Sequence, residues 1–206
     1  MSRVKLIFRP EEFPGDPDET TREELAAFFD HLFPAGQGEH EPHSGYATLA
    51  HSPATAYAIS KCADHIVRRM GWTQRRDLRE IAVQTLNLHF KCDFSFHAHL
   101  PLAEVSGITP QQQAAIPYWR TSDLFDEEQK LVIEFTQAVV SGDVPEELFA
   151  QVAARYGEAG AIECTVAIGW WSLWAMLLNT TRPAFRTERS QPLPKDSMDL
   201  TKFEKA

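Results

Sequence analysis

The sequence predicts an all-α protein, and three observations support this prediction. Apolar residues recur at helical spacing through most of the 206 residues. No stretch alternates apolar and polar residues as a half-buried strand does. Glycine and proline occur where such helical stretches would begin or end, and no sequence repeat of fixed period is present.

The N-terminal part is predicted to contain one helix between irregular segments. Residues 1–19 are rich in proline and acidic side chains and are expected to be irregular. A helix is predicted over 21–33, with Thr20 or Thr21 as its cap. Its apolar stripe consists of Leu25, Phe28, Phe29 and Leu32. The glycines and histidines of 34–46 indicate a loop.

The middle of the chain is predicted to form three consecutive helices. The first begins at Pro53, a residue favoured at the first helical position, and ends near Gly71. The next follows Thr73. The third spans 93–106 and ends at Gly107, where a left-handed backbone would stop it.

Further helices are predicted in the C-terminal half. A short one covers 109–116, and a longer one runs from an Asp126 cap to Val140. Two more are expected over 145–156 and 159–179, separated by Gly157.

The last of these helices resembles a membrane span in length and apolar character. However, Glu163 lies within it, and its tryptophans lie in the middle rather than at two interfaces. These tryptophans are Trp170, Trp171 and Trp174. We therefore expect a buried helix, and these rings to lie in the core, at a subunit interface or beside an apolar substrate.

Composition narrows the class of protein. An apolar content of 43% with 24% charged residues is ordinary for a soluble globular protein. The net charge of −9 argues against nucleic acid as a partner, because a phosphate backbone needs a basic surface. Three widely spaced cysteines suit the reducing cytoplasm, and the helical positions of Cys62 and Cys164 suggest two core residues.

The residues with most chemical potential lie between positions 80 and 99. Cys92 directly precedes a predicted helix, where the helix dipole favours a thiolate. Ser95 and His99 are four residues apart and share one helix face. Glu80 comes from the preceding helix and would join them if the two helices pack antiparallel. Such a cluster can transfer protons along a line.

Two blocks of this sequence resemble the carboxymuconolactone decarboxylase family, which also contains the alkylhydroperoxidase D proteins. The first block comprises Leu78-Arg79-Glu80-Ile81-Ala82 and Cys92-x-Phe94-Ser95-Phe96-x-x-His99-x-Pro101-Leu102-Ala103, followed by Gly107. The second comprises Phe135-Thr136, Tyr156-Gly157-x-x-Gly160-x-x-Glu163, Gly169-Trp170-Trp171 and Leu177-Leu178-Asn179. The resemblance covers roughly residues 45–185. It implies the family's helical fold, assembly into dimers, trimers or hexamers, and a catalytic role for Glu80, Cys92, Ser95 and His99.

The domain organisation expected from this resemblance has three parts. Residues 1–44 would be an N-terminal extension with one helix, and 45–185 would be the family's helical domain. Residues 186–206 would be a polar C-terminal tail, extended or disordered.

Position 95 departs from the family patterns. The peroxidase branch has a second cysteine there, which resolves the oxidised first one as a disulfide, and serine cannot do this. The decarboxylase-like branch often has glutamate there. Three roles are open to Ser95: a hydrogen bond to His99, a nucleophile, or only a small helix residue.

Each of the other candidates also has a structural interpretation. Cys92 alone could be an inert apolar residue, and Glu80 could belong to a solvated charged face. His97 lies about 200° around the helix from His99 and is expected at the surface or in an interface. Because His89, His97 and His99 lack the i, i+4 spacing of zinc enzymes, no metal or cofactor is expected.

Three functions follow from these residues. The first is acid/base chemistry on a small unsaturated acid or lactone, with His99 as acid/base, Glu80 as its orienting group and Cys92 as relay or polarising group. The second is reduction of hydroperoxides by Cys92 with an external thiol as resolver. The third is a non-catalytic oligomeric binding protein whose site has decayed.

Overall fold

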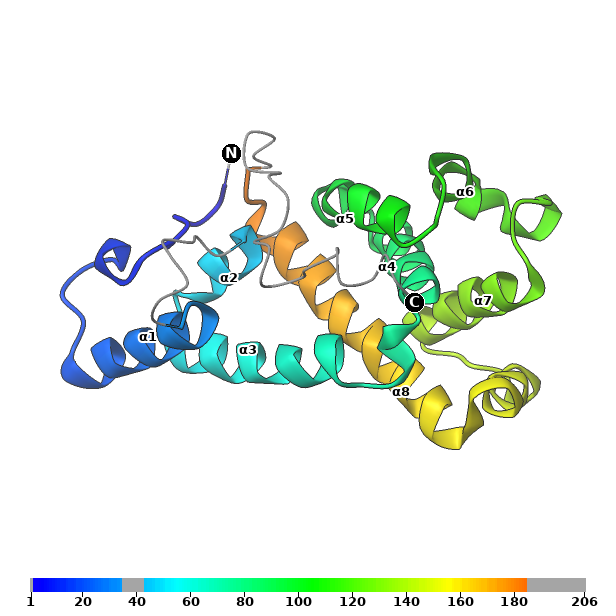
Figure 1. Cartoon of the computed structure of the whole chain (residues 1–206). Coiled ribbons are helices and arrows are strands. Elements are labelled where there is room, and N and C mark those ends of the chain that lie inside the picture. The colour runs from blue at the N-terminus through cyan, green and yellow to red at the C-terminus, as the bar shows by residue number, and fades with distance from the viewer. Residues whose placement is uncertain (1, 35–42, 185–206) are drawn as a thin grey trace. The chain divides into compact units, whose positions relative to one another are not determined.

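The computed structural model describes residues 2–34 and 43–184, and every regular element among them is helical, as predicted (Figure 1). The predicted tail over 186–206 lies outside the described residues. The described residues divide into two compact units. One contains the residues up to Asp64 together with those from Thr180, and the other contains His65–Asn179.

The N-terminal unit is built on an apolar cluster. Its elements are η1 (Pro10–Glu12), α1 (Glu19–Leu32), α2 (Ser44–Leu49) and the first part of α3 (Pro53–Arg68). Its buried cluster consists of Ile7, Leu25, Phe28, Phe29, Ala50 and Ala56. The expected boundary at residue 44 therefore falls inside this unit, because Ala50 and Ala56 pack with α1. Asp18, rather than Thr20 or Thr21, caps α1, since its Oδ1 accepts a 2.8 Å hydrogen bond from the N–H of Thr21.

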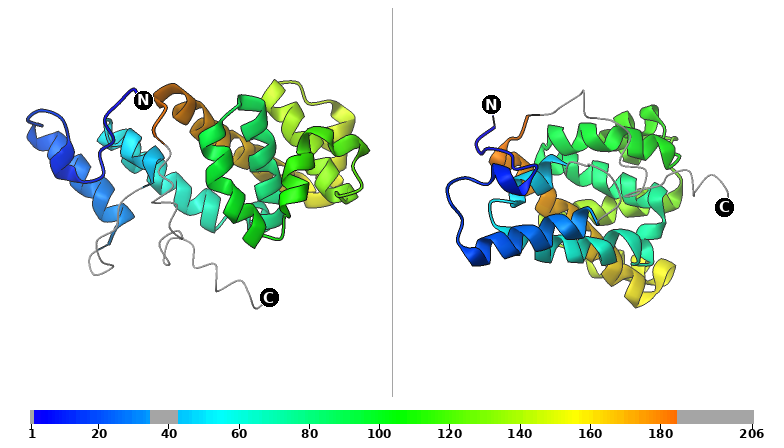
Figure 2. Two further views of the ribbon diagram at one scale, coloured as in Figure 1. Left: turned by 90° about the horizontal axis from the view of Figure 1, so that it is seen from above. Right: turned by 60° about the vertical axis from the view of Figure 1, so that its left-hand side comes forward.

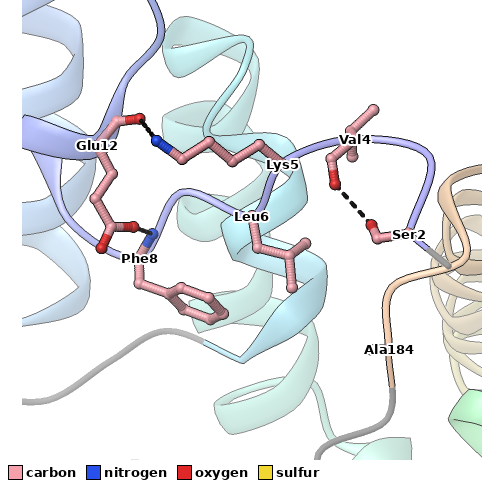
Figure 3. Close-up of a pocket in the computed structure, with 7 residues that line it drawn as sticks. All are labelled: Ser2, Val4, Lys5, Leu6, Phe8, Glu12 and Ala184. Carbon is pink, nitrogen blue, oxygen red and sulfur yellow. Dashed lines mark hydrogen bonds between the residues drawn. The ribbon is translucent and has the colours of Figure 1, made fainter.

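A pocket of about 460 Å³ lies beside the N-terminal segment of this unit (Figure 3). It is lined by Ser2, Val4, Lys5, Leu6, Phe8, Glu12 and Ala184. Glu12 closes one side of it, because its carboxylate accepts from the N–H of Phe8 and its carbonyl accepts from Nζ of Lys5. None of the predicted site residues lines this pocket.

The second unit is arranged around α4. Its elements are η2 (Trp72–Gln74), α4 (Arg76–Phe90), α5 (Asp93–Val105), α6 (Pro110–Ala115), η3 (Ile116–Thr121), α7 (Glu127–Ser141) and α8 (Glu146–Thr181) as far as Asn179. Helix α4 packs against both α5 and α7, and Figure 2 shows these helices from two further directions. Every residue from Leu78 to Asn87 is buried. A helix that is buried on all sides can present polar groups only to other protein groups.

The predicted helix ends agree with the backbone at several glycines. Gly142 ends α7 with φ of 81°, and Gly107 follows α5 with φ of 91°. Gly157 interrupts α8 with φ of 75°, where the sequence predicted a break between two helices. Helix α2 was not predicted, because it begins inside the stretch 34–46 that was assigned to a loop and has only six residues.

Helix α8 is long enough and apolar enough to span a membrane. However, half of its most apolar stretch is buried within the protein. Trp170, Trp171 and Trp174 are each 8% exposed. Cys164 is fully buried as expected, whereas Cys62 is exposed, so its assignment to the core was wrong. Cys62 lies on a face of α3 where few neighbouring residues are buried.

Candidate active site

Glu80 and His99 form a hydrogen-bonded pair between α4 and α5. The Oε2 atom of Glu80 lies 2.7 Å from Nδ1 of His99. The Glu80 side chain is 1% exposed and the His99 side chain is 17% exposed, so the carboxylate is dry while the ring reaches solvent. A carboxylate partner makes Nδ1 the proton donor, which leaves Nε2 to accept or release a proton. Within the described part of the chain, Nε2 forms no hydrogen bond.

Arg79 binds the other oxygen of the same carboxylate. Its Nε and Nη2 atoms each lie 3.0 Å from Oε1 of Glu80. Arg79 is 3% exposed, so the charged face to which Glu80 could have belonged is not solvated at these two residues. Adjacent residues of a helix point in different directions, so their spacing gave no indication of this contact.

The pKa of Glu80 reflects three opposing influences. Burial raises the pKa, because it disfavours the charged form. The nearby His99 and then Arg79 lower it by charge and hydrogen bonding, and together they outweigh burial. The pKa of Glu80 therefore lies below its usual value, and the buried carboxyl is ionised at neutral pH.

Cys92 is placed as predicted, at the N-cap of α5, but its environment opposes a thiolate. Burial raises the pKa of the Cys92 thiol, and the charge of Asp93 adds to this effect. The N–H of Ser95 favours the thiolate but does not outweigh burial. The expectation from the helix dipole alone was wrong in direction, because the thiol is 1% exposed.

Ser95 is buried beside the other candidates without bonding to His99. Ser95 is 4% exposed, and its backbone N–H is directed at Cys92. Among the hydrogen bonds of the described residues, none joins Ser95 to His99 or to Glu80. The structure thus brings Glu80 and His99 together directly, whereas Cys92 and Ser95 adjoin each other at the beginning of α5.

A chain of buried amides holds α5 beside α4. Nε2 of Gln84 donates to the carbonyl of Phe96 at 3.2 Å and to Oε1 of Gln113 at 2.9 Å. Nε2 of Gln113 donates in turn to the carbonyl of Leu100 at 3.4 Å. These two carbonyls lie on either side of His99 in sequence. The amides therefore fix the rotation of α5 that directs His99 to Glu80.

The amides of α4 were not predicted as part of the site, although their spacing in the sequence could have indicated them. Glu80, Gln84 and Asn87 lie at i, i+4 and i+7, on one face of a helix that is otherwise rich in apolar residues. Nδ2 of Asn87 donates to Oε1 of Gln84 at 3.3 Å, while its own Oδ1 has no partner among the described residues.

The remaining histidines of this region lie away from the pair. His97 is exposed, as predicted, and its Nδ1 lies 2.7 Å from the carbonyl of Asp93. His89 is exposed near the end of α4. Over residues 2–34 and 43–184, no group of three or more His, Cys, Asp or Glu side chains is placed to hold a metal ion.

Comparison with known proteins adds one solved structure. The sequence matches no family profile and no curated protein. The structure is similar to that of a cysteine-to-alanine variant of the debrominase Bmp8 in complex with 2,3,4-tribromopyrrole. The match covers 97% of this chain and 98% of that chain, with a TM-score of 0.61 and 17% identity.

At this identity the similarity concerns the fold. The protein has an all-α structure of the alkylhydroperoxidase D-like type, which is the fold class that the sequence resemblance implied.

Proposed function

We propose that this protein is an enzyme that moves a proton to or from a small unsaturated acid, lactone or related ring compound, with His99 as general acid/base. The observation that supports this most strongly is the 2.7 Å bond between a dry carboxylate and a histidine that reaches solvent. Such a pair fixes the ring and leaves one nitrogen for the substrate.

Each residue has a distinct part in the proposed reaction. Nε2 of His99 takes up a proton from one substrate atom or delivers it to another. Glu80 orients the ring and stabilises the imidazolium that forms when the proton is taken up. Cys92, as a neutral thiol at the beginning of α5, would polarise the substrate or relay a proton rather than act as a nucleophile.

The second candidate is thiol chemistry at Cys92. The fold similarity to a debrominase whose structure is that of a cysteine-to-alanine variant supports this candidate. Because that variant is in complex with 2,3,4-tribromopyrrole, halogenated pyrroles are further substrates to test. Hydroperoxide reduction needs a readily formed thiolate, and the raised pKa of Cys92 opposes it.

A substrate screen with matched variants tests the proposal. Lactones, unsaturated acids and bromopyrroles are incubated with the wild type, His99→Gln, Cys92→Ala and His97→Gln. We expect turnover of a compound from the first two classes, a loss of at least 100-fold in His99→Gln, and wild-type turnover in His97→Gln. Full activity in His99→Gln together with none in Cys92→Ala would replace acid/base chemistry by thiol chemistry. Turnover of none of these compounds, nor of an organic hydroperoxide with an external thiol, would favour the non-catalytic alternative.

We also propose that the protein is a homo-oligomer and that it is cytoplasmic. Large apolar side chains on α8 are exposed in the single chain, including Ile162 at 59% and Met176 at 51%. A second copy of the chain is a partner that would remove them from water. Sedimentation equilibrium measures the assembly size directly.

A further inference from the structure

Arg79 is a buried guanidinium whose hydrogen bonds are directed toward the Glu80–His99 pair. Two of its nitrogens converge on Oε1 of Glu80, each at 3.0 Å. His99 has Oε2 of the same carboxylate at 2.7 Å. The two oxygens are thus divided between the two partners, and neither partner competes for the other's oxygen.

Contacts other than Glu80 also hold Arg79 in place. Its Nη1 donates to the carbonyl of Thr73 at 3.4 Å, and its guanidinium lies 5.8 Å from the ring centroid of Trp171. Thr73 is itself fixed by bonds from its hydroxyl to the carbonyls of Ile66 and Met70, at 2.6 and 2.8 Å. Groups from η2 and α8 therefore position the guanidinium from sides that Glu80 does not occupy.

The charge of Arg79 has a specific consequence for the pair. An isolated buried carboxylate takes up a proton rather than remain charged. Glu80 would then be a weaker acceptor for the Nδ1 proton of His99. The other groups of the described residues that interact electrostatically with Glu80 are His99 and Arg76 of the same helix. Arg79 differs from both, because it carries a permanent charge and contacts the carboxylate of Glu80 directly.

We propose that Arg79 is a positioning residue: it holds Glu80 as a carboxylate with Oε2 directed at His99. This inference rests on the proposed role of the pair, but its test needs no substrate. If the acid/base function fails while the test succeeds, Arg79 still organises the pair, and the pair must serve another purpose. The two failures are therefore distinguishable.

The test follows the Glu80 carboxyl directly by ¹³C NMR of protein labelled at glutamate, with the signal assigned by its absence in Glu80→Gln. Arg79→Met removes the charge and the hydrogen bonds while keeping much of the volume. Arg69→Met is the matched control, because it removes an exposed arginine outside this site. In Arg79→Met we expect the carboxyl to bind its proton at least tenfold more tightly, so that its midpoint rises by one pH unit or more. Arg69→Met should leave the midpoint at its wild-type value.

A second variant keeps the test decisive if Arg79→Met does not fold. Arg79→Lys retains the charge but has one side-chain nitrogen, which cannot reproduce the two contacts that Nε and Nη2 of Arg79 make with Glu80. The hydrogen-bonded Nδ1 proton of His99, seen in ¹⁵N-labelled protein, then reports the alignment. Loss or a clear shift of this signal in folded Arg79→Lys supports the proposal. An unchanged Glu80 midpoint in folded Arg79→Met overturns it, as does an unchanged His99 signal in Arg79→Lys when only that variant folds.

Discussion

Glu80 and His99 are nineteen residues apart, yet Oε2 of the one and Nδ1 of the other lie at 2.7 Å. Glu80 is shielded from water on an entirely buried stretch of α4, whereas His99 lies on a helix with few buried residues. The pair therefore joins the centre of its unit to the periphery. A proton taken up by the ring is stabilised by a carboxylate that solvent does not reach.

Removing Glu80 should destabilise the fold more than removing the whole ion pair. In Glu80→Ala the guanidinium of Arg79 remains buried without its partner, which typically costs about 3–5 kcal/mol. The double variant Arg79→Met/Glu80→Met replaces both groups by apolar ones and should recover much of this loss. Urea denaturation of the wild type, the single variants Arg79→Met and Glu80→Met and their double variant measures the coupling, and Glu80→Ala is measured beside them. Equal stabilities of Glu80→Ala and the double variant would contradict the expectation.

The ion cluster around Glu128 should contribute stability that is lost in acid. A hydrogen bond from Nε of Arg155, at 2.9 Å, is the main influence that lowers the pKa of Glu128, to about 2. Because the folded pKa lies below the usual value of about 4.3, the contribution is complete above about pH 5 and disappears as the pH falls toward 2.

The expected size of this contribution is modest. Arg155 is 56% exposed, so solvent screening limits the contribution of the Glu128 carboxylate to about 0.2–1 kcal/mol. Glu128→Gln should lower the free energy of unfolding at pH 7 and have much less effect near pH 2. The measurement is urea denaturation at several pH values, with Glu127→Gln as an exposed control. A Glu128→Gln effect that does not change with pH would exclude this linkage.

Gly71 and Glu163 should be energetically coupled. Oε2 of Glu163 accepts a 2.7 Å bond from the N–H of Trp72, and a Cβ added at Gly71 would lie 3.2 Å from the same oxygen. Gly71 has an ordinary helical backbone, so alanine there should stabilise by about 0.4–1 kcal/mol if no neighbour opposed it. In the wild-type background the displaced carboxylate should cancel this gain, whereas in Glu163→Ala the gain should appear.

A thermal unfolding series of the two single variants and the double variant tests this coupling. Glu163→Ala alone should cost about 1–2 kcal/mol through the lost hydrogen bond. If Gly71→Ala has the same effect in both backgrounds, the carboxylate does not restrict this glycine.

Gln84 should be required for the placement of α5. Gln84→Met removes donors to Phe96 and Gln113 and leaves buried acceptors without partners, at about 1–3 kcal/mol. Hydrogen exchange of α5 amides should become faster than in Gln111→Met, which changes an exposed glutamine of α6. Equal exchange in the two variants would show that packing alone holds α5.

Most of the helices could be predicted from the sequence because local signals determine them. Apolar spacing, the Asp126 cap and the left-handed glycines Gly107 and Gly142 act within a few residues, and the structure has each of them. Helix α2 was missed because its six residues are too few to show a period. The exposure of Cys62 was missed because a helical pattern does not reveal which neighbours are absent.

The site was only partly predictable for a similar reason. The pairing of Glu80 with His99 depends on how α4 and α5 pack. The sequence pattern indicated it only on the condition that these helices pack antiparallel, and the family resemblance implied it. Arg79 could not be placed, since a long side chain can bend back to its neighbour or extend to solvent. The effect of burial on Cys92 was underestimated, because burial is a property of the folded chain and not of the helix start.

The three cysteines give this chain a built-in reporter of local opening. Cys62 is exposed, whereas Cys92 and Cys164 are buried at the beginning of α5 and within α8. An alkylating reagent should modify Cys62 at once and the other two only when their surroundings open transiently. The ratio of the alkylation rates of Cys92 and Cys164 then compares transient opening beside the candidate active site with transient opening of the long helix. Labelling followed by peptide mass spectrometry measures both in a single sample, with no added probe.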